Sequence, residues 1–396
     1  MMADLRNYTI SDVAIISNPM ISHRKIHFIN FSRRLAVSTL TFLIPLYFLK
    51  IGFVGWQIGL IVSCFGFAPL LFSFPIGLIN DRLMIERIIQ GALLSLSLLI
   101  FLLSATKNFF LIALIFLFLG LANNALDVSI NSLYYKEESN KNLNKKYGLL
   151  AFWLALGMAC GTLLGGMLTH FASFHVLFYV YAVFLLLVLL FSHGLGGGRF
   201  DRVPIKEYKL SLLNKKTILF AILMFALSLH WGVEGTVYSP FLKKYFQFNN
   251  LQLSLYISLP LFVLSFSAFF IGLLKYNARV NKRIFLLSMF LSGLGHVLMV
   301  NRIVYISFFF RVVHEVGDGF LGALNVLYIS KLFEKRSIGG SSGILLAVMT
   351  FGYMVSALIF SSLGYKFGLQ YPFYISGLIL IGNALFGYYV FRRQEY

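Results

Sequence analysis

Twelve long apolar runs fill most of this sequence and decide what it can fold into. Each run holds about 20 residues, the length that an α-helix needs to cross the hydrocarbon core of a bilayer. Inside that core every backbone N–H and C=O group has to be paired, and a helix does this within one segment. The sequence therefore predicts an all-α membrane protein with twelve transmembrane helices, at residues 30–50, 54–79, 87–106, 109–133, 147–169, 173–192, 217–242, 250–274, 283–300, 303–330, 340–365 and 370–391.

Charged residues are few and lie mainly between these runs. They make up 12% of the chain, whereas soluble domains contain about 25%. The net charge of +19 would suit a nucleic acid, but Lys and Arg form neither a basic domain nor a basic helix face. We therefore expect the lipid bilayer and a small-molecule solute as partners, no nucleic acid, and a monomer. Cys64 and Cys160 lie in apolar runs, so we expect neither a disulfide nor a metal site from them.

The distribution of Lys and Arg predicts how the chain is oriented. Twelve spans put both termini on one side, and that side carries 26 of the 33 basic residues. The other side carries six, and Arg311 lies within a span. Because basic residues concentrate in cytoplasmic loops, we expect both termini in the cytoplasm and the protein in the plasma (cytoplasmic or inner) membrane.

The runs divide into two groups of six. Segment 193–216 separates them, and its glycines predict a flexible cytoplasmic linker. We therefore expect one six-helix bundle at 27–192 and a second at 217–392, with cytoplasmic ends at 1–26 and 393–396.

The two halves also resemble each other in sequence. A shift of 195 residues places Gly148 on Gly343, and a shift of 194 places Asn131 on Asn325. Agreement near one offset predicts two pseudo-symmetric bundles. Two six-helix halves of parallel topology are typical of one large group of secondary transporters.

The loop after the second run carries a motif of a known family. In "GLINDRLMIER", Gly77 is followed four residues later by Asp81 and Arg82, and then by Arg87. This pattern resembles the cytoplasmic signature of the major facilitator superfamily, although Met84 stands where a second Gly is usual. The chain resembles this superfamily over nearly its full length. The resemblance implies two halves that rock about a central site, with this loop as a gating loop between them.

The gating loop has an expected partner in the second half. The resemblance implies that it latches the two halves together. The N-terminus of a helix carries a partial positive charge, which attracts a carboxylate. We therefore expect Asp81 to contact the start of the helix at 340–365, near Ser341 and Ser342.

Two further motifs resemble patterns of the same superfamily. Glycines recur every four residues in "GMACGTLLGG" (157–166), as in a motif of its exchangers, and this favours export; plain helix packing explains them equally well. The segment "RVVHEVGDGF" (311–320) resembles an Arg-x-x-x-Gly-x-Gly pattern that the superfamily usually carries in its fourth span. Here the pattern lies in the tenth span, and Glu315 replaces a glycine.

Ionisable residues inside the spans gather in the first, fourth, seventh and tenth runs. Each costs about 2.5–3.5 kcal/mol at mid-membrane, so it should face a cavity or a partner. The resemblance implies that these four helices line a central cavity. His296, in the ninth run, is expected to be a packing histidine. We predict that the cavity is lined by Arg33, Arg34, Asp127, Trp231, Tyr238, Arg311 and Phe320.

Ion pairs are expected among these residues. Arg33 or Arg34 can pair with Asp127, and Arg311 can pair with Glu315 or Asp318. One arginine cannot neutralise three carboxylates at mid-depth. A carboxylate left over is desolvated and becomes a usable proton carrier. Helical spacing also places these groups on shared faces, so the proton-coupling candidates are Glu315, Asp318, Glu234, His314 and His230.

The sequence thus predicts a secondary active transporter that is not an enzyme and that needs no cofactor besides the proton gradient. Surplus acid in the cavity favours a cationic or zwitterionic organic solute. Two alternatives stay open: an organic anion bound by Arg311, and a divalent metal bound by His230, His314 and carboxylates. An intramembrane zinc protease is excluded, because "HEVGD" has Asp318 where the second His of HExxH is required. We therefore predict no catalytic residue and no resident metal.

Overall fold

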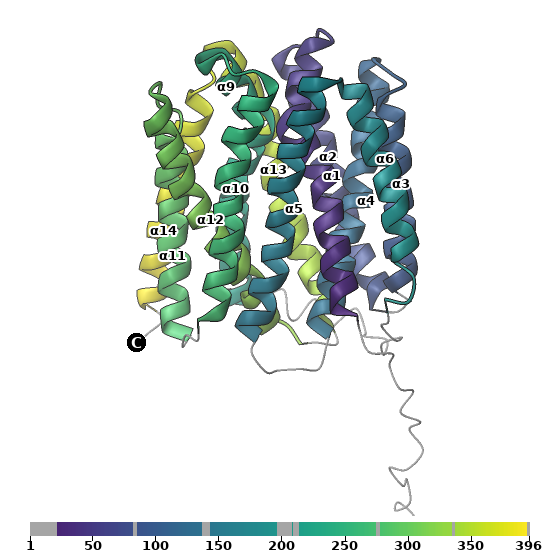
Figure 1. Ribbon diagram of the computed structural model, residues 1–396. Coiled ribbons are helices and arrows are strands. Elements are labelled where there is room, and N and C mark those ends of the chain that lie inside the picture. The colour runs from purple at the N-terminus through teal and green to yellow at the C-terminus, as the bar shows by residue number, and fades with distance from the viewer. Residues whose placement is uncertain are drawn as a thin grey trace, which may run out of the picture.

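The computed structural model describes residues 22–81, 85–136, 143–195, 208, 214–274, 278–334 and 337–393. Within these residues every regular element is a helix, and the helices stand side by side in one bundle (Figure 1). The predicted fold class is confirmed. Nine of the described segments are long and apolar enough to cross a membrane. Three further helices, α1, α11 and α12, lie alongside them in the same bundle (Figure 1).

Each half contributes six spans. The N-terminal half consists of α1 (His23–Lys50), α2 (Gly55–Asn80), α3 (Ile85–Leu103), α4 (Phe109–Lys136), α5 (Leu143–Phe171) and α6 (Phe174–Phe191). In the C-terminal half, three consecutive elements form one long span: α8 (Lys215–Val233), the π-helical turn η1 (Glu234–Tyr238) and α9 (Ser239–Phe246). The other five are α10 (Asn250–Leu273), α11 (Ala278–Leu298), α12 (Val304–Leu332), α13 (Ile338–Phe367) and α14 (Tyr371–Arg393).

Several helices extend beyond the apolar runs that predicted them. α1 begins at His23, inside the segment 1–26 that was expected as a cytoplasmic end, and α8 begins at Lys215, inside the expected linker 193–216. A helix keeps its backbone paired as it leaves the hydrocarbon core, so polar residues can continue it. Most of those two segments and the tail 394–396 lie outside the described residues.

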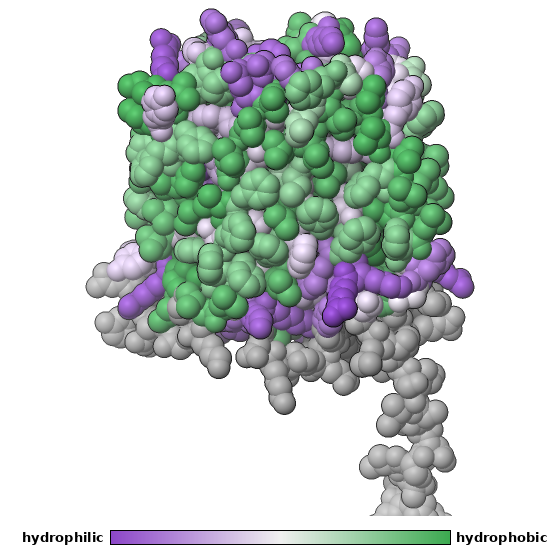
Figure 2. All heavy atoms as spheres, in the orientation of Figure 1, coloured by the Kyte–Doolittle hydropathy of each residue, from purple (hydrophilic) through white to green (hydrophobic). Residues whose placement is uncertain are grey.

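The bundle has two distinct ends. α1 begins and α14 ends at the same one, the lower end in Figure 1, which we call the terminal end. α9 lies at the opposite end. Figure 2 shows apolar side chains covering the middle of the visible face, with hydrophilic ones gathered at both ends. This is the surface that a bilayer-spanning protein presents to lipid and to water.

The halves meet along two pairs of helices. Where α2 meets α13, a Cβ on Gly77 would lie 2.3 Å from the backbone oxygen of Gly339. Where α5 meets α10, a Cβ on Gly148 would lie 2.6 Å from the Cα of Gly272. Only glycine permits such contact, so the backbones of the two halves touch at the terminal end.

The halves are also joined at the opposite end. There the Ser361 hydroxyl donates to the backbone oxygen of Gly55 at 2.7 Å, and the Asn250 amide donates to the backbone oxygen of Thr169 at 3.2 Å. The described residues are thus in contact across the halves at both ends, an arrangement that we call the closed conformation.

The glycine row of α5 has a packing role. A Cβ on Gly157 would lie 2.3 Å from the backbone oxygen of Phe31, and one on Gly161 would lie 2.0 Å from that of Leu35. Both contacts are with α1, in the same half. The row therefore lets two helices of the N-terminal half approach closely.

Candidate functional site

A buried cluster of charged residues lies within the C-terminal half. It is built by His230 at the end of α8, Glu234 at the start of η1, and Arg311, His314, Glu315 and Asp318 on α12. The side chain of Asp318 is 9% exposed and the others are more deeply buried. The π-helical turn begins at Glu234, and such turns often occur at functional sites.

Glu234 lies at the centre of this cluster. Its Oε1 atom is 2.6 Å from Nη1 of Arg311 and 2.9 Å from Nε2 of His314. Nδ1 of His296, on α11, is 3.6 Å from the same oxygen. Three basic groups from two other helices therefore converge on one carboxylate.

Arg311 joins this carboxylate to a second one. Its guanidinium is ion-paired with Glu234 and also with Glu315, four residues later on the same helix. The ring of Tyr238 lies 4.7 Å from the guanidinium carbon, in cation–π contact. The expected pair of Arg311 with Glu315 is thus present, and Glu234 is its second partner.

Asp318 shares His314 with Glu234, at 3.8 Å from Nε2 of His314, and has further partners of its own. It accepts hydrogen bonds from Nε1 of Trp231 at 3.1 Å and from the Ser292 hydroxyl at 2.6 Å. Nε2 of His230 lies 3.1 Å from Asp318 Oδ2. Asp318 therefore pairs with a histidine and not with Arg311, because Arg311 lies two helical turns away, beside Glu234.

The two histidines at these carboxylates are oriented by backbone carbonyls. Nδ1 of His230 donates to the backbone oxygen of Leu227 at 2.5 Å, and Nδ1 of His314 donates to that of Ser292 at 2.8 Å. A carbonyl only accepts, so each Nδ1 carries hydrogen. Each Nε2 then faces a carboxylate oxygen, at 3.1 Å for His230–Asp318 and at 2.9 Å for His314–Glu234. Two lone pairs at such distances repel each other, so we infer one proton between the two atoms of each contact.

This geometry gives the cluster a definite charge balance. Three carboxylates face one arginine, and the two histidine–carboxylate contacts hold one further proton each. Nε2 of His296 is hydrogen-bonded to the Ser376 hydroxyl at 3.0 Å. With His296 neutral, three negative and three positive charges cancel. Neutrality is what an apolar surrounding favours, because a net buried charge is costly.

Part of this cluster has the residue types of a metal site. Ligand atoms of His230, Glu234 and His314 lie within 4.8 Å of one another. However, the guanidinium of Arg311 is already only 2.6 Å from the carboxylate of Glu234. Its fixed positive charge repels a second cation there, so the cluster is better described as an ion-pair network than as a metal centre.

A second charged cluster lies within the N-terminal half. Arg33 and Arg34 on α1 both pair with Asp127 on α4, Arg34 at 3.3 Å. Arg33 also donates to the side-chain oxygens of Asn30, at 2.8 Å, and Asn123, at 3.0 Å. The sequence predicted that one arginine pairs with Asp127, and the structure has both.

The two clusters do not form one charged cavity. Among the described residues, no hydrogen bond or ion pair joins one cluster to the other. Between the halves lies a void of only about 10 Å³ with mostly apolar walls, including Leu40 of α1, Phe65 of α2 and Tyr353 of α13. In this closed conformation each half pairs its own charges internally, so one cavity lined by all these charges stays a prediction.

The gating loop meets the second half as expected. Asp81 Oδ2 accepts a hydrogen bond from the backbone N–H of Gly340 at 3.0 Å, in the first turn of α13. Tyr208, from the segment between the halves, donates its hydroxyl to the same oxygen at 2.8 Å. Its ring packs beside Phe74 and is fully buried. Arg87 is exposed, and Arg82 lies outside the described residues.

Removing the Tyr208 hydroxyl should loosen this end of the molecule. A hydrogen bond to a charged group contributes about 1.5–3 kcal/mol, so Tyr208→Phe should open the terminal end at least tenfold more often. The measurement is the labelling rate of Ser341→Cys after Cys64 and Cys160 are replaced by Ser. Tyr371→Phe, at the opposite end, is the control and should leave the rate unchanged. Equal labelling rates in the Ser341→Cys protein with and without Tyr208→Phe would contradict a latching role for Tyr208.

Most predicted site residues come together, and some were missed. Trp231 and Tyr238 join the C-terminal cluster, whereas Phe320 is half-buried and packs against the hydrophobic core. His296 was expected to be a packing histidine, but it lies beside Glu234. Ser292 and Tyr208 were not singled out at all, because a lone serine or tyrosine carries no spacing signal.

Comparison with known families agrees with this architecture. The Major Facilitator Superfamily model matches residues 26–228 and 220–396. The chain belongs to this superfamily. A search of curated proteins gives no match.

Solved structures with the same fold are transporters of this superfamily. The human organic anion transporter MFSD10 (TETRAN) is 14% identical, with a TM-score of 0.74 over 92% of this chain and 99% of that one. Two structures of the nucleoside transporter NupG, one of a mutant, are 13% and 14% identical, with TM-scores of 0.70 and 0.69 over 93% of this chain and 98% of theirs. At such identities the likeness extends to the fold alone. The chain is thus a membrane transporter of a small solute, and the family generally contains no enzymes.

Proposed function

We propose that this transporter is coupled to protons, and that the C-terminal cluster carries them. The observation that carries this proposal is the pair of contacts of His230 with Asp318 and of His314 with Glu234, each of which needs a proton. These are the exchangeable charges of an otherwise neutral cluster, whose other members are Arg311, Glu315 and His296. Loss of either proton leaves a net negative charge in an apolar surrounding, which destabilises the closed conformation.

The same balance supports a cationic or zwitterionic organic solute. When the cluster releases a proton, a positive group on the solute can take its place. Protons and solute would then occupy the transporter alternately, which is the scheme of an exchanger. Such a scheme moves an organic cation out of the cell as protons move in. The glycine row of α5 resembles an exchanger motif and agrees with export.

An organic anion is the second candidate. The N-terminal cluster contains two arginines and one aspartate, so it holds a net positive charge. The side chain of Arg34 is 24% exposed, so it is more accessible to a solute than Arg33 or Arg311. The human protein of similar fold is described as an organic anion transporter. A divalent metal is a weaker candidate, because Arg311 occupies the position beside Glu234.

Proteoliposomes with an imposed pH gradient test these proposals. The probes are tetraphenylphosphonium (a cation), glycine betaine (a zwitterion), p-aminohippurate (an anion), uridine and Zn²⁺. We expect gradient-driven accumulation of the cation or the zwitterion, and a smaller accumulation in Glu315→Gln and Asp318→Asn. Accumulation of p-aminohippurate that depends on Arg34 would favour the second candidate. Unchanged gradient-driven transport in both carboxylate variants would overturn proton coupling through this cluster.

We also propose that the terminal end faces the cytoplasm of a plasma membrane. This rests on the 26 basic residues on that side of the sequence, against six on the other. In intact cells, a membrane-impermeant thiol reagent should then label Lys107→Cys, in the loop between α3 and α4. It should not label Arg87→Cys, at the start of α3. The opposite pattern would reverse the orientation.

A further inference from the structure

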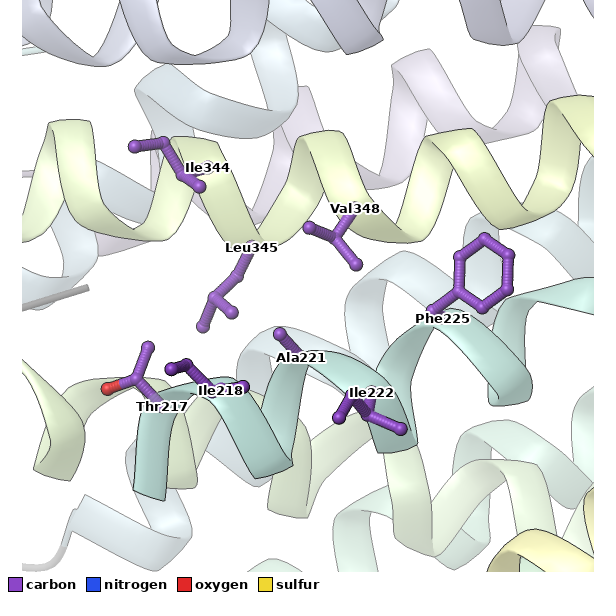
Figure 3. Close-up of a pocket in the computed structure, with 8 residues that line it drawn as sticks. All are labelled: Thr217, Ile218, Ala221, Ile222, Phe225, Ile344, Leu345 and Val348. Carbon is purple, nitrogen blue, oxygen red and sulfur yellow. The ribbon is translucent and has the colours of Figure 1, made fainter. Parts of the chain in front are cut away.

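α8 and α13 enclose an apolar groove that the transport site does not use. It has a volume of about 430 Å³ and lies near the start of both helices (Figure 3). In Figure 3, Ala221 of α8 and Leu345 and Val348 of α13 extend into the space between the helices. This volume lies within the range of roughly 300–1,000 Å³ that is usual for pockets that bind small organic molecules.

The groove exists because the two helices diverge toward the terminal end. Farther along, they are in direct contact: a Cβ on Gly352 would lie 2.6 Å from the backbone oxygen of Phe225, and one on Gly232 would lie 2.5 Å from that of Tyr353. The rings of Phe225 and Phe351 lie 5.6 Å apart at this junction. The groove is therefore a wedge that is closed by aromatic side chains on one side and open toward the terminal end.

The open side of the wedge lies on the outer surface of the bundle. Ile218 and Ile222 are 46% and 49% exposed, although both lie within a membrane-spanning segment. In a bilayer such a surface meets lipid chains and not water. A groove with an almost wholly apolar lining is not hydrated, so a hydrocarbon chain is the occupant that its walls favour.

A basic residue continues the same helix face toward the headgroups. Lys215, Ile218 and Ile222 follow the i, i+3, i+7 spacing, so they share one stripe of α8. Lys215 and Lys216 are exposed in the first turn of the helix, whose start is capped by Asn214. A lysine near the membrane surface attracts an anionic headgroup by about 1 kcal/mol.

We propose that this groove binds one anionic phospholipid, with an acyl chain in the wedge and its phosphate on Lys215 and Lys216. The bound chain supports the spacing of α8 and α13 at the terminal end. Those two helices carry His230 of the charged cluster and Gly340 of the Asp81 contact. The lipid therefore stabilises the closed conformation, independently of which solute is transported.

Lipid binding to the purified protein tests the proposal. Native mass spectrometry should show one tightly bound phosphatidylglycerol, and thermal unfolding should shift upward when this lipid is added to detergent-solubilised protein. The double variant Lys215→Gln/Lys216→Gln should lose most of both effects. The matched control is Lys243→Gln/Lys244→Gln, an exposed lysine pair in α9 at the opposite end, which should keep them.

A groove-filling variant tests the contribution of the acyl chain separately from that of the headgroup. Ala221→Phe should abolish tight binding, because its ring occupies the wedge. Val348→Phe repeats the test from α13 and serves if Ala221→Phe unfolds at a lower temperature without lipid. The proposal is overturned if Lys215→Gln/Lys216→Gln binds phosphatidylglycerol as well as its lysine control does. It is also overturned if the groove-filling variants bind this lipid as well as the unmodified protein does. Equal binding of phosphatidylcholine would overturn the anionic assignment.

Discussion

Arg311→Gln should destabilise this protein more than any other single charge removal. The residue is fully buried between Glu234 and Glu315, so its loss leaves two buried carboxylates without their cation. Removing one partner of a buried ion pair typically costs about 3–5 kcal/mol. The measurement is thermal or denaturant-induced unfolding of the purified protein in detergent. Arg302→Gln, an exposed arginine beside Tyr245 at the opposite end, should have little effect.

A second substitution tests the reason for this loss. If net charge is the cause, Glu315→Gln added to Arg311→Gln restores neutrality and should recover much of the stability. Arg311→Gln alone should also be less harmful at low pH, because a proton on a carboxylate replaces the lost positive charge. If the double variant is as unstable as Arg311→Gln, the loss of stability comes from the altered packing of the side chain and not from the charge balance.

Helical spacing predicted which charged residues share a face, and the structure agrees. His230 and Glu234 lie four residues apart and have side-chain atoms within 4.8 Å of each other, and Arg311 and Glu315, also four apart, form an ion pair. The chain direction of the helices could also have predicted which residues meet between two spans. α8 and α12 belong to an odd-numbered and an even-numbered span and therefore run in opposite directions. The earlier residue of one must then meet the later residue of the other, as His230 meets Asp318.

Other features depend on how the helices are rotated and packed, which spacing does not report. His296 is the lone ionisable residue in the span part of α11, and only the packing of that helix brings it to Glu234. The π-helical turn at Glu234 adds a residue to one turn of a continuous span, and no sequence pattern marks it. The separation of the two clusters by Leu40, Phe65 and Tyr353 likewise follows from the closed arrangement of the halves.

Asp318→Asn should halve the proton coupling of transport. In the proposed mechanism, the pairs His230–Asp318 and His314–Glu234 of the unmodified protein each hold one exchangeable proton. One pH unit is a tenfold ratio of proton activity. With two protons exchanged per solute and the membrane potential held at zero, that unit sustains a roughly 100-fold solute gradient. The amide N–H of an asparagine donates to Nε2 of a neutral His230 without a further proton, so the variant should sustain a gradient of about tenfold.

The measurement is the steady-state solute ratio across proteoliposomes at several pH gradients, with the membrane potential held at zero. The slope of its logarithm against the pH difference gives the number of protons, corrected for the charge state of the solute. Glu86→Gln is the control, because Glu86 accepts hydrogen bonds from the backbone of Gly194 and Leu195, far from the cluster in the other half. It should keep a slope near two. An unchanged slope in Asp318→Asn would mean that the His230–Asp318 pair does not carry a transported proton, and the remaining pair and Glu315 would then have to supply the coupling.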